Sequence, residues 1–122
     1  MEEAFYISSN NELNYLGTYS EYYISGHNVV TFDIPQYATT VACAYNKLTR
    51  LVLPKGLRFI NCCHNQLTEL ILPEGVETVH CEGNEIKNLI LPESLLGICC
   101  DIGTLDMVEY KNSRINITLF IK

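Results

Sequence analysis

Hydrophobic and polar positions along the chain recur with a period of 19 residues. The clearest copy runs from Leu57 to Gly75 and reads L-x-x-I-x-C-x-x-N-x-L-x-x-L-x-L-P-x-x. Six columns keep this step, which indicates a structural repeat rather than an accident of composition. The columns are Val41, Ile60, Val79 and Ile98; Cys43, Cys62, Cys81 and Cys100; Asn46, Asn65 and Asn84; Leu48, Leu67, Ile86 and Leu105; Leu51, Leu70, Leu89 and Val108; and Pro35, Pro54, Pro73 and Pro92.

Each repeat unit predicts one coil of a solenoid. The alternation of Ile60 and Cys62 predicts a short strand with one buried face. Asn65 can end this strand, because its side chain bonds to nearby backbone and tolerates turn geometry. The leucines that follow fold back over the core as extended or short 3₁₀ segments. Pro73 suits the start of the next coil, since it fixes an extended or turn conformation and lacks an amide donor.

The period covers nearly the whole chain, so we expect a single domain over residues 1–122. Regular coils are expected from about 19 to 113, and a capping strand from about 114 to 122. A degenerate first coil is expected at about 3–18, where the repeat positions hold Phe5, Asn10, Leu13 and Tyr15. Terminal repeats are usually atypical, because they cover the open ends of the core.

The repeat resembles the leucine-rich repeat over roughly residues 3–121. The phrase Asn-x-Leu-Thr-x-Leu, at Asn46 and again at Asn65, precedes Leu-Pro-x-Gly-Leu or Leu-Pro-Glu-Gly-Val. These phrases are similar to the short bacterial class found in secreted effectors of the YopM and IpaH type. The cysteine column is similar to the cysteine ladder of internalin J. Similar short repeats also occur in amoebal and giant-virus proteins.

The resemblance implies a leucine-rich-repeat solenoid with a parallel β-sheet on its concave face, mostly extended or 3₁₀ convex segments and little α-helix. It also implies protein–protein interaction as the usual role. Effectors of the IpaH type carry a separate ubiquitin-ligase domain with a catalytic cysteine, and no segment here corresponds to it. Internalins carry a signal and a wall anchor, and we find neither pattern in this sequence.

Two columns are interpreted as structural ladders. The inward strand position is filled by Cys43, Cys62, Cys81 and Cys100. Free cysteine there acts as a small buried hydrophobe, and we expect reduced thiols because parallel side chains would need distortion to form a disulfide. The second ladder is formed by Asn46, Asn65 and Asn84. Their amides are expected to satisfy backbone groups between coils that would otherwise be buried and unpaired.

The strand register also predicts which side chains face solvent on the concave side. Three aromatic residues are candidate anchors for a protein partner, namely Tyr23, Tyr45 and Phe59. The polar members of the candidate binding surface are Asn61, His64, His80, Glu82 and Asp101. Tyr45 and His64 are expected in turns at the edge of this surface. Among the other N-terminal tyrosines, Tyr6 is expected on the concave face. Three more fall in inward columns and are expected to cap the core, namely Tyr15, Tyr19 and Tyr22.

Part of this surface also allows a metal or thiol site. The register places His80 beside Cys99, with Cys63 on the preceding strand, and such residues bind zinc or form an activated Cys–His nucleophile. Usual zinc signatures use Cys-x-x-Cys pairs, however, and a flat sheet offers no closed tetrahedral cage. The sequence also contains no recognisable oxyanion-hole element or glycine-rich phosphate loop. We therefore predict no bound metal, no cofactor and no enzymatic activity.

The composition limits the classes of binding partner and the cellular location that we expect. The chain has 14 Asp and Glu against 8 Lys and Arg, a net charge of −6, which argues against nucleic acid and anionic membrane as partners. We find no apolar run near the roughly 20 residues that span a bilayer and no signal-peptide pattern at the N-terminus. The expected location is the cytoplasm, which for an effector or viral protein is the host cytosol.

The leading functional prediction is a non-enzymatic protein–protein interaction module that uses its concave sheet. Its partner is a protein of unknown identity, and its role is that of an effector or of a viral, bacterial or host accessory protein. The alternative is a structural component that self-associates or packs into a larger assembly such as a virion. A well-capped monomer favours the first prediction, and an exposed sheet end favours the second.

Overall fold

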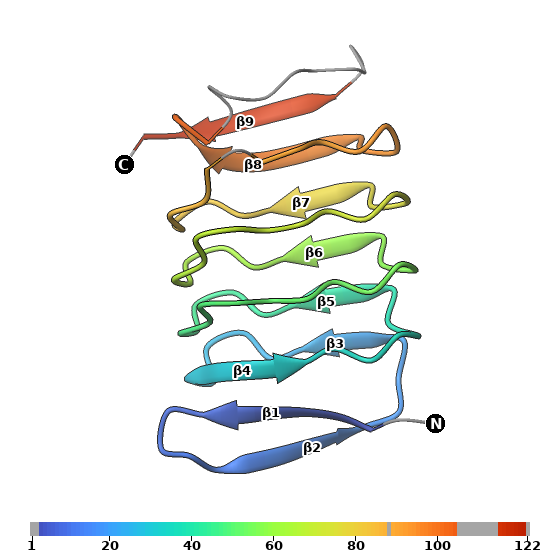
Figure 1. Cartoon of the computed structure of the whole chain (residues 1–122), viewed down its shortest axis with the longest axis vertical. Coiled ribbons are helices and arrows are strands. Elements are labelled where there is room, and N and C mark those ends of the chain that lie inside the picture. The colour runs from blue at the N-terminus through green and yellow to red at the C-terminus, as the bar shows by residue number, and fades with distance from the viewer. Residues whose placement is uncertain (1–2, 88, 105–114, 122) are drawn as a thin grey trace.

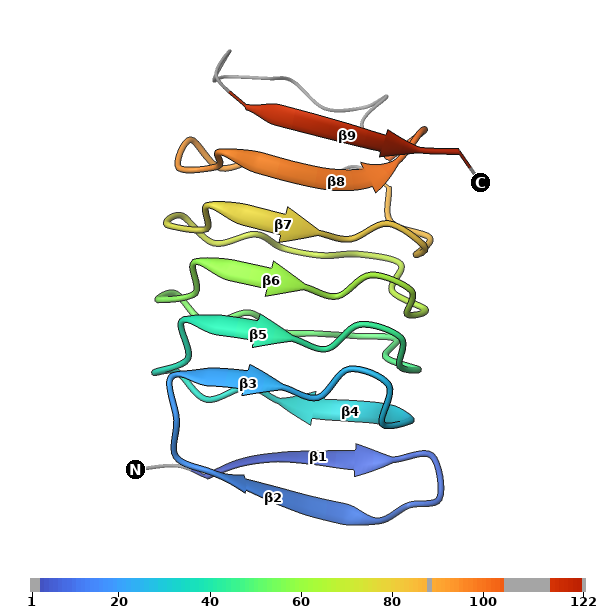
Figure 2. The ribbon, with the colours of Figure 1, turned by 180° about the vertical axis from the view of Figure 1, so that it is seen from behind.

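The computed structural model describes residues 3–87, 89–104 and 115–121, and within them the chain is a β-solenoid (Figure 1). Successive coils stack along one axis, with the N-terminal hairpin at one end and the last strand at the other, as both views show (Figure 2). The described residues contain no helix, which confirms a repeat solenoid with extended return segments. No helix that could cross a membrane is found in this part of the chain.

One strand from each coil contributes to a six-stranded parallel sheet in the order β3-β5-β6-β7-β8-β9. The strands are β3 (Glu21–Tyr23), β5 (Thr40–Ala42), β6 (Phe59–Asn61), β7 (Thr78–His80), β8 (Gly97–Asp101) and β9 (Asn116–Phe120). Val41 pairs with Ile60, and Ile60 pairs with Val79. The register is therefore the predicted 19-residue step, and β-branched residues, which suit a half-buried pleated surface, take the inward position.

Each regular coil starts with a tight turn at its proline. The carbonyl of Pro54 accepts a hydrogen bond from the amide of Leu57 at 3.2 Å, and the carbonyl of Pro92 accepts one from Leu95 at the same distance. These turns confirm that the prolines start the coils. They also explain how a proline fits here, because it supplies the carbonyl of the turn and needs no amide of its own.

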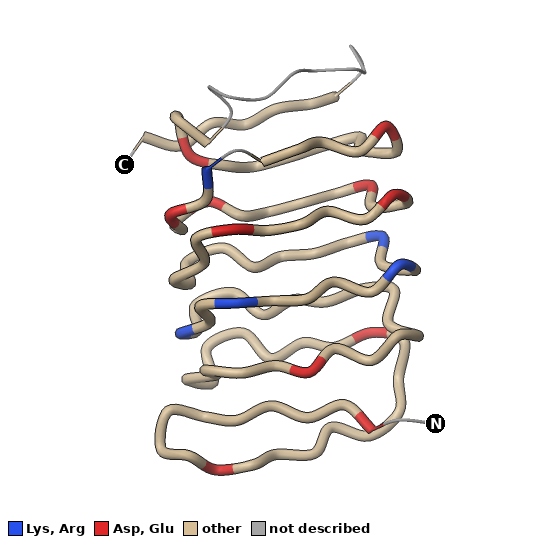
Figure 3. Tube along the Cα trace, in the orientation of Figure 1, with Lys and Arg blue, Asp and Glu red and all other residues tan. Residues whose placement is uncertain are grey.

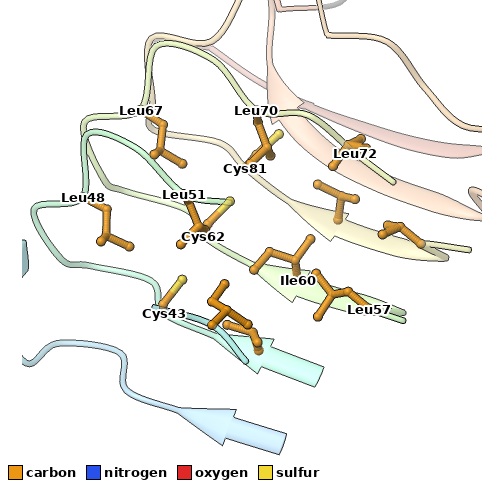
Figure 4. Packing of buried hydrophobic residues seen from close by; sticks show 14 of the residues in the cluster. Cys43, Leu48, Leu51, Leu57, Ile60, Cys62, Leu67, Leu70, Leu72 and Cys81 are labelled. Carbon is orange, nitrogen blue, oxygen red and sulfur yellow. The ribbon is translucent and has the colours of Figure 1, made fainter. Parts of the chain in front are cut away.

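The core lies between the sheet and the return segments. Figure 4 shows side chains from both sides pointing into this interior, including Ile60, Leu67 and three cysteines, Cys43, Cys62 and Cys81. Ile60 and Leu67 are fully buried, and Cys62 is buried beside them. Truncation of a buried leucine to alanine typically costs about 2–5 kcal/mol of stability, so these columns account for a large part of the fold's stability.

The asparagine ladder joins neighbouring coils as predicted. The Asn65 side chain accepts a hydrogen bond from the amide of Leu48 at 2.9 Å and donates to the carbonyls of Cys43 at 3.0 Å and Cys62 at 3.1 Å. Asn84 makes the same three bonds one coil later, with the amide of Leu67 and two cysteine carbonyls. Asn46 extends this ladder back to the first coil.

Residues 4–17 do not form the expected degenerate coil. They form an antiparallel hairpin of β1 (Ala4–Ser8) and β2 (Leu13–Gly17), and β1 also pairs with β4 (Val29–Asp33), the return strand of the first coil. The turn contains Asn11 at a φ of 65°, a left-handed conformation that asparagine tolerates. The hairpin covers the first coil, and Ala4 is fully buried against the core.

The hairpin also changes the interpretation of the N-terminal tyrosines. Tyr22 is buried as predicted, but Tyr15 and Tyr19 are 65% and 63% exposed, so their inward assignment is wrong. Tyr15 lies on β2, an edge strand of the three-stranded sheet. Tyr6, expected on the concave register, instead lies on β1 and packs against the core.

The last described strand, β9, pairs in parallel with β8 and lies within the predicted capping segment. Its repeat positions Ile117 and Leu119 are 37% and 49% exposed. The predicted repeat residues Leu105 and Val108 and the end of the last regular coil lie outside the described residues.

Candidate functional site

The outward side of the six-stranded sheet carries two columns of half-buried or exposed residues. We call these two columns and the adjoining turn residues Tyr45 and His64 the sheet face. The first column contains Glu21, Thr40, Phe59, Thr78, Gly97 and Asn116. The second contains Tyr23, Ala42, Asn61, His80, Cys99 and Thr118. The predicted strand register is therefore correct for both columns.

Strands β6 and β7 bring together three predicted site residues. Asn61 and His80 are partners across these strands, and the rings of Phe59 and His80 lie 5.7 Å apart with their planes tilted by 50°. The Asn61 side-chain oxygen accepts a hydrogen bond from the amide of Cys63 at 3.3 Å. The centre of the sheet face thus combines an aromatic ring with amide and imidazole groups.

Tyr23 lies apart from this group, on β3. Its side chain is 64% exposed, and its hydroxyl donates a 2.5 Å hydrogen bond to Glu21. This bond raises the pKa of Tyr23 above its usual value, since ionisation of the phenol would place a negative charge against the carboxylate.

Tyr45 and His64 form an aromatic stack at the edge of the sheet face. Their ring centroids are 4.6 Å apart and the ring planes differ by 12°. Both residues have left-handed backbone, with φ of 55° and 54°. The sequence predicted both as edge residues but did not predict their contact. Their separation by one repeat could have indicated it, because residues one repeat apart are neighbours in successive coils.

The next outward position along the chain, two residues after the second column, is more buried than predicted. Asp101 is 4% exposed, and its carboxylate accepts hydrogen bonds from the amide of Gly83 at 2.9 and 3.1 Å. Its expected place on a solvent-facing surface is therefore wrong, because the turn at Gly83 covers it. Cys63, also expected to face solvent, is 7% exposed. Glu82 is half-buried, and its Oε1 has no hydrogen-bond partner among the described residues.

All six cysteines are free thiols. Burial raises the pKa of Cys43 to about 12. Burial together with the nearby Glu82 carboxylate raises the pKa of Cys63 to about 11. Burial also raises the pKa values of Cys62, Cys81 and Cys100. Thiols with raised pKa stay protonated near neutral pH, and a protonated thiol is a poor nucleophile and metal ligand.

The alternative metal or thiol site is not assembled as a cluster. His80 and Cys99 are neighbours across β7 and β8, but Cys63 is buried beneath the edge of the sheet face. In the described part of the chain, no three His, Cys, Asp or Glu side chains are grouped so that they could hold a metal ion.

The side of the solenoid opposite the sheet carries an apolar column that sequence reasoning missed. Val52, Ile71 and Ile90 repeat at the 19-residue step and are 73%, 79% and 81% exposed. Two shallow cavities of about 210 and 430 Å³ lie beside them between coils. These residues form one more column with the 19-residue period in the sequence. Because they are apolar like the core residues, the sequence did not show that they point outward.

Charge is unevenly distributed over the molecule. Figure 3 shows most Lys and Arg in the middle coils and Asp and Glu towards both ends. The strand positions of the sheet face include the carboxylate of Glu21 and no Lys or Arg. Arg58 and Glu77, which precede the first column, lie 3.7 Å apart at its margin. The strand positions of the sheet face therefore carry one formally charged side chain, the carboxylate of Glu21.

Comparison with protein-family models, with curated proteins and with solved structures found no match for this chain.

Proposed function

We propose that the chain is a non-enzymatic binding module that holds a protein partner against its sheet face. The observation that carries the proposal is the presence of aromatic and polar side chains at outward positions that the fold does not use. Tyr23 and Tyr45 are each 64% exposed, while the core is built from separate inward columns. Large, rigid aromatic side chains are common anchors at protein interfaces.

We further propose that the coils are leucine-rich repeats of the short bacterial type, working in a cytoplasmic compartment as an effector or accessory protein. The asparagine ladder supports the repeat assignment, because Asn46, Asn65 and Asn84 use their amides to join successive coils. For Cys63, the buried member of the alternative thiol site, the raised pKa supports a structural role, because the thiol stays protonated near neutral pH.

The test is a quantitative pull-down with tagged protein, comparing wild type with Tyr23→Ala/Phe59→Ala. The matched control is Val52→Ala/Ile71→Ala, which removes exposed apolar side chains from the opposite side. The proposal expects at least one partner to be lost by the sheet-face variant and kept by the control. Equal recovery of every partner by wild type and the sheet-face variant would contradict it.

Self-assembly is a second candidate function, favoured by the exposed apolar side chains of the last strand. Leu119 and Phe120 on β9 are 49% and 42% exposed, and Ile121 is 86% exposed. An edge strand with such side chains can pair with another chain. Light scattering after size exclusion tests this: assembly requires a mass that grows with concentration, and a monomer of 13.8 kDa at all concentrations excludes it.

A further inference from the structure

The aliphatic column on the side opposite the sheet is bordered by charged side chains whose sign changes from one coil to the next. Arg50 lies two residues before Val52, and Glu69 lies two residues before Ile71. All four side chains are exposed, and they are among the residues that line the shallow cavity of about 210 Å³ between these coils. We call these four residues the return-side patch. It combines two apolar side chains with one cation and one carboxylate.

The fold makes little use of the side chains of this patch. Its two apolar members are 73% and 79% exposed. Arg58 and Glu77, which are also one repeat apart, form an ion pair at 3.7 Å. Arg50 and Glu69 form no such pair with each other in the part of the chain that the structure describes. Both charges and the apolar surface between them are therefore available to another molecule.

The patch is complementary to itself. Two copies can face each other across a two-fold axis that runs along the return segments, midway between the coils of Val52 and Ile71. Such an axis reverses the order of the coils but keeps the order of positions along each segment. Val52 then faces Ile71 of the second copy, and Arg50 faces Glu69 of the second copy. Because every contact of a two-fold interface forms twice, the apolar contact is flanked by two ion pairs.

The turns that end the return segments repeat the same change of sign. Lys55 lies in the turn after Val52, Glu74 takes the equivalent place one coil later, and both are exposed. Figure 3 shows this change from basic to acidic residues between successive coils. The same axis sets Lys55 opposite Glu74 of the second copy. An axis moved onto the coil of Ile71 would instead set Glu69 against its own equivalent, and like charges in contact are unfavourable. The charges therefore select one axis.

We propose that the return-side patch is a dimer interface and that its occupant is a second copy of this chain. The inference goes beyond the proposed function, because it concerns a surface separate from both the sheet face and β9. The apolar contact is small, since Asp33 takes the column position in the first coil and meets Ile90 of the second copy at the rim. A standard stable interface buries about 800 Å² per partner, so the dimer is weak and reversible.

Sedimentation equilibrium of the intact protein over a wide range of concentrations tests the closed dimer. The mass should rise from the monomer value of 13.8 kDa towards twice that value and then stop, because a two-fold interface is used up when two copies meet. A monomer at every concentration would overturn the proposal. A mass that continues to grow beyond the dimer would also overturn it, since open assembly requires a different surface.

Charge reversal tests the axis. Arg50→Glu sets two glutamates against each other, and Glu69→Arg sets two arginines against each other, so each variant alone should dimerise at least about tenfold more weakly than wild type. An equimolar mixture of the two variants should restore a dimer of about wild-type affinity, because each copy then supplies the charge that the other lacks. Recovery on mixing also shows that neither variant is misfolded.

Lys47→Glu is the matched control, because it makes the same change of charge at an exposed position in the same coil. The axis places Lys47 opposite Gln66 of the second copy, an uncharged residue, so this variant should dimerise like wild type. A mixture of Arg50→Glu and Glu69→Arg that associates no more tightly than either variant alone would overturn the axis. A loss with Lys47→Glu as large as the loss with Arg50→Glu would reduce the effect to net charge and overturn it as well.

Discussion

At the scale of single residues, Asn65 shows how one side chain joins the backbone of two neighbouring coils. It accepts from Leu48 and donates to Cys43 and Cys62, and it is 8% exposed. Asn65→Ala leaves the buried amide of Leu48 without its acceptor, while the carbonyls of Cys43 and Cys62 keep their bonds from Asn46 and Asn84. We therefore expect the free energy of unfolding to fall by about 1–3 kcal/mol. Urea unfolding followed by circular dichroism measures this change.

Gln66→Ala is the control for that measurement, because Gln66 is adjacent and exposed. Surface substitutions of this kind usually change stability by no more than about 0.5 kcal/mol. A loss at Asn65 no larger than the loss at Gln66 would contradict the structural role of the ladder.

The residue scale also shows what a repeat pattern can and cannot predict. The buried roles of Asn65 and Cys62 follow from the period, because a column that is polar or small in every coil must satisfy the same environment each time. The register predicted the position of Asp101 on its strand correctly, but not its low solvent exposure. Its burial depends on the turn at Gly83 in the preceding coil, whose amide donates to the carboxylate. The equivalent amides of Tyr45 and His64 donate to backbone carbonyls instead, so the repeat did not predict this side-chain contact.

At the scale of strands, the cysteine column predicts how stability depends on pH. Burial raises the pKa of Cys43 from its usual value of 9.0 to about 12. Below about pH 9 the thiol is protonated in both states, so its contribution to stability is fully present. As pH rises from about 9 towards 12, the unfolded chain loses this proton first, and the free energy of unfolding falls by up to about 1.4 kcal/mol per pH unit for each such thiol.

Urea unfolding at several pH values between about 7.5 and 10 measures this slope. Cys43→Ala should make the decline above pH 9 shallower, because one buried titrating group is removed. Val52→Ala, an exposed change on the opposite side, should leave the slope unchanged. The same slope in wild type and Cys43→Ala would show that the thiol is not shielded from solvent in the folded protein.

Element boundaries were predictable where the repeat is regular and not where it degenerates. Strands β5, β6 and β7 follow the 19-residue register. The N-terminal segment was matched to the same register through Phe5 and Leu13, yet it forms a hairpin. Two adjacent asparagines, at 10 and 11, interrupt the segment at its middle. Asparagine at a turn between two alternating runs favours a hairpin, and this local preference prevailed over a weak repeat match.

At the scale of the whole molecule, the solenoid has two chemically different sides. The sheet face combines Tyr23, Phe59 and His80 with a carboxylate at Glu21, whereas the opposite side exposes an aliphatic column that includes Ile71. The strand register predicted the residues of the sheet face, but it did not predict that the aliphatic column on the opposite side points outward. It could not predict which contacts join residues within one side, because stacks such as Tyr45 on His64 depend on ring orientation.

The most direct test of the sheet face as the binding surface is site-specific photo-crosslinking in cells that express the protein. A benzophenone amino acid is placed at Asn61, at the centre of the sheet face, or at Ile71, on the opposite side. The account predicts a discrete conjugate with another protein from position 61 that is lost when Tyr23→Ala and Phe59→Ala are added, whereas position 71 gives at most a conjugate between two copies of the chain. A conjugate with another protein from position 71 alone, or one from position 61 that survives both substitutions, would contradict it.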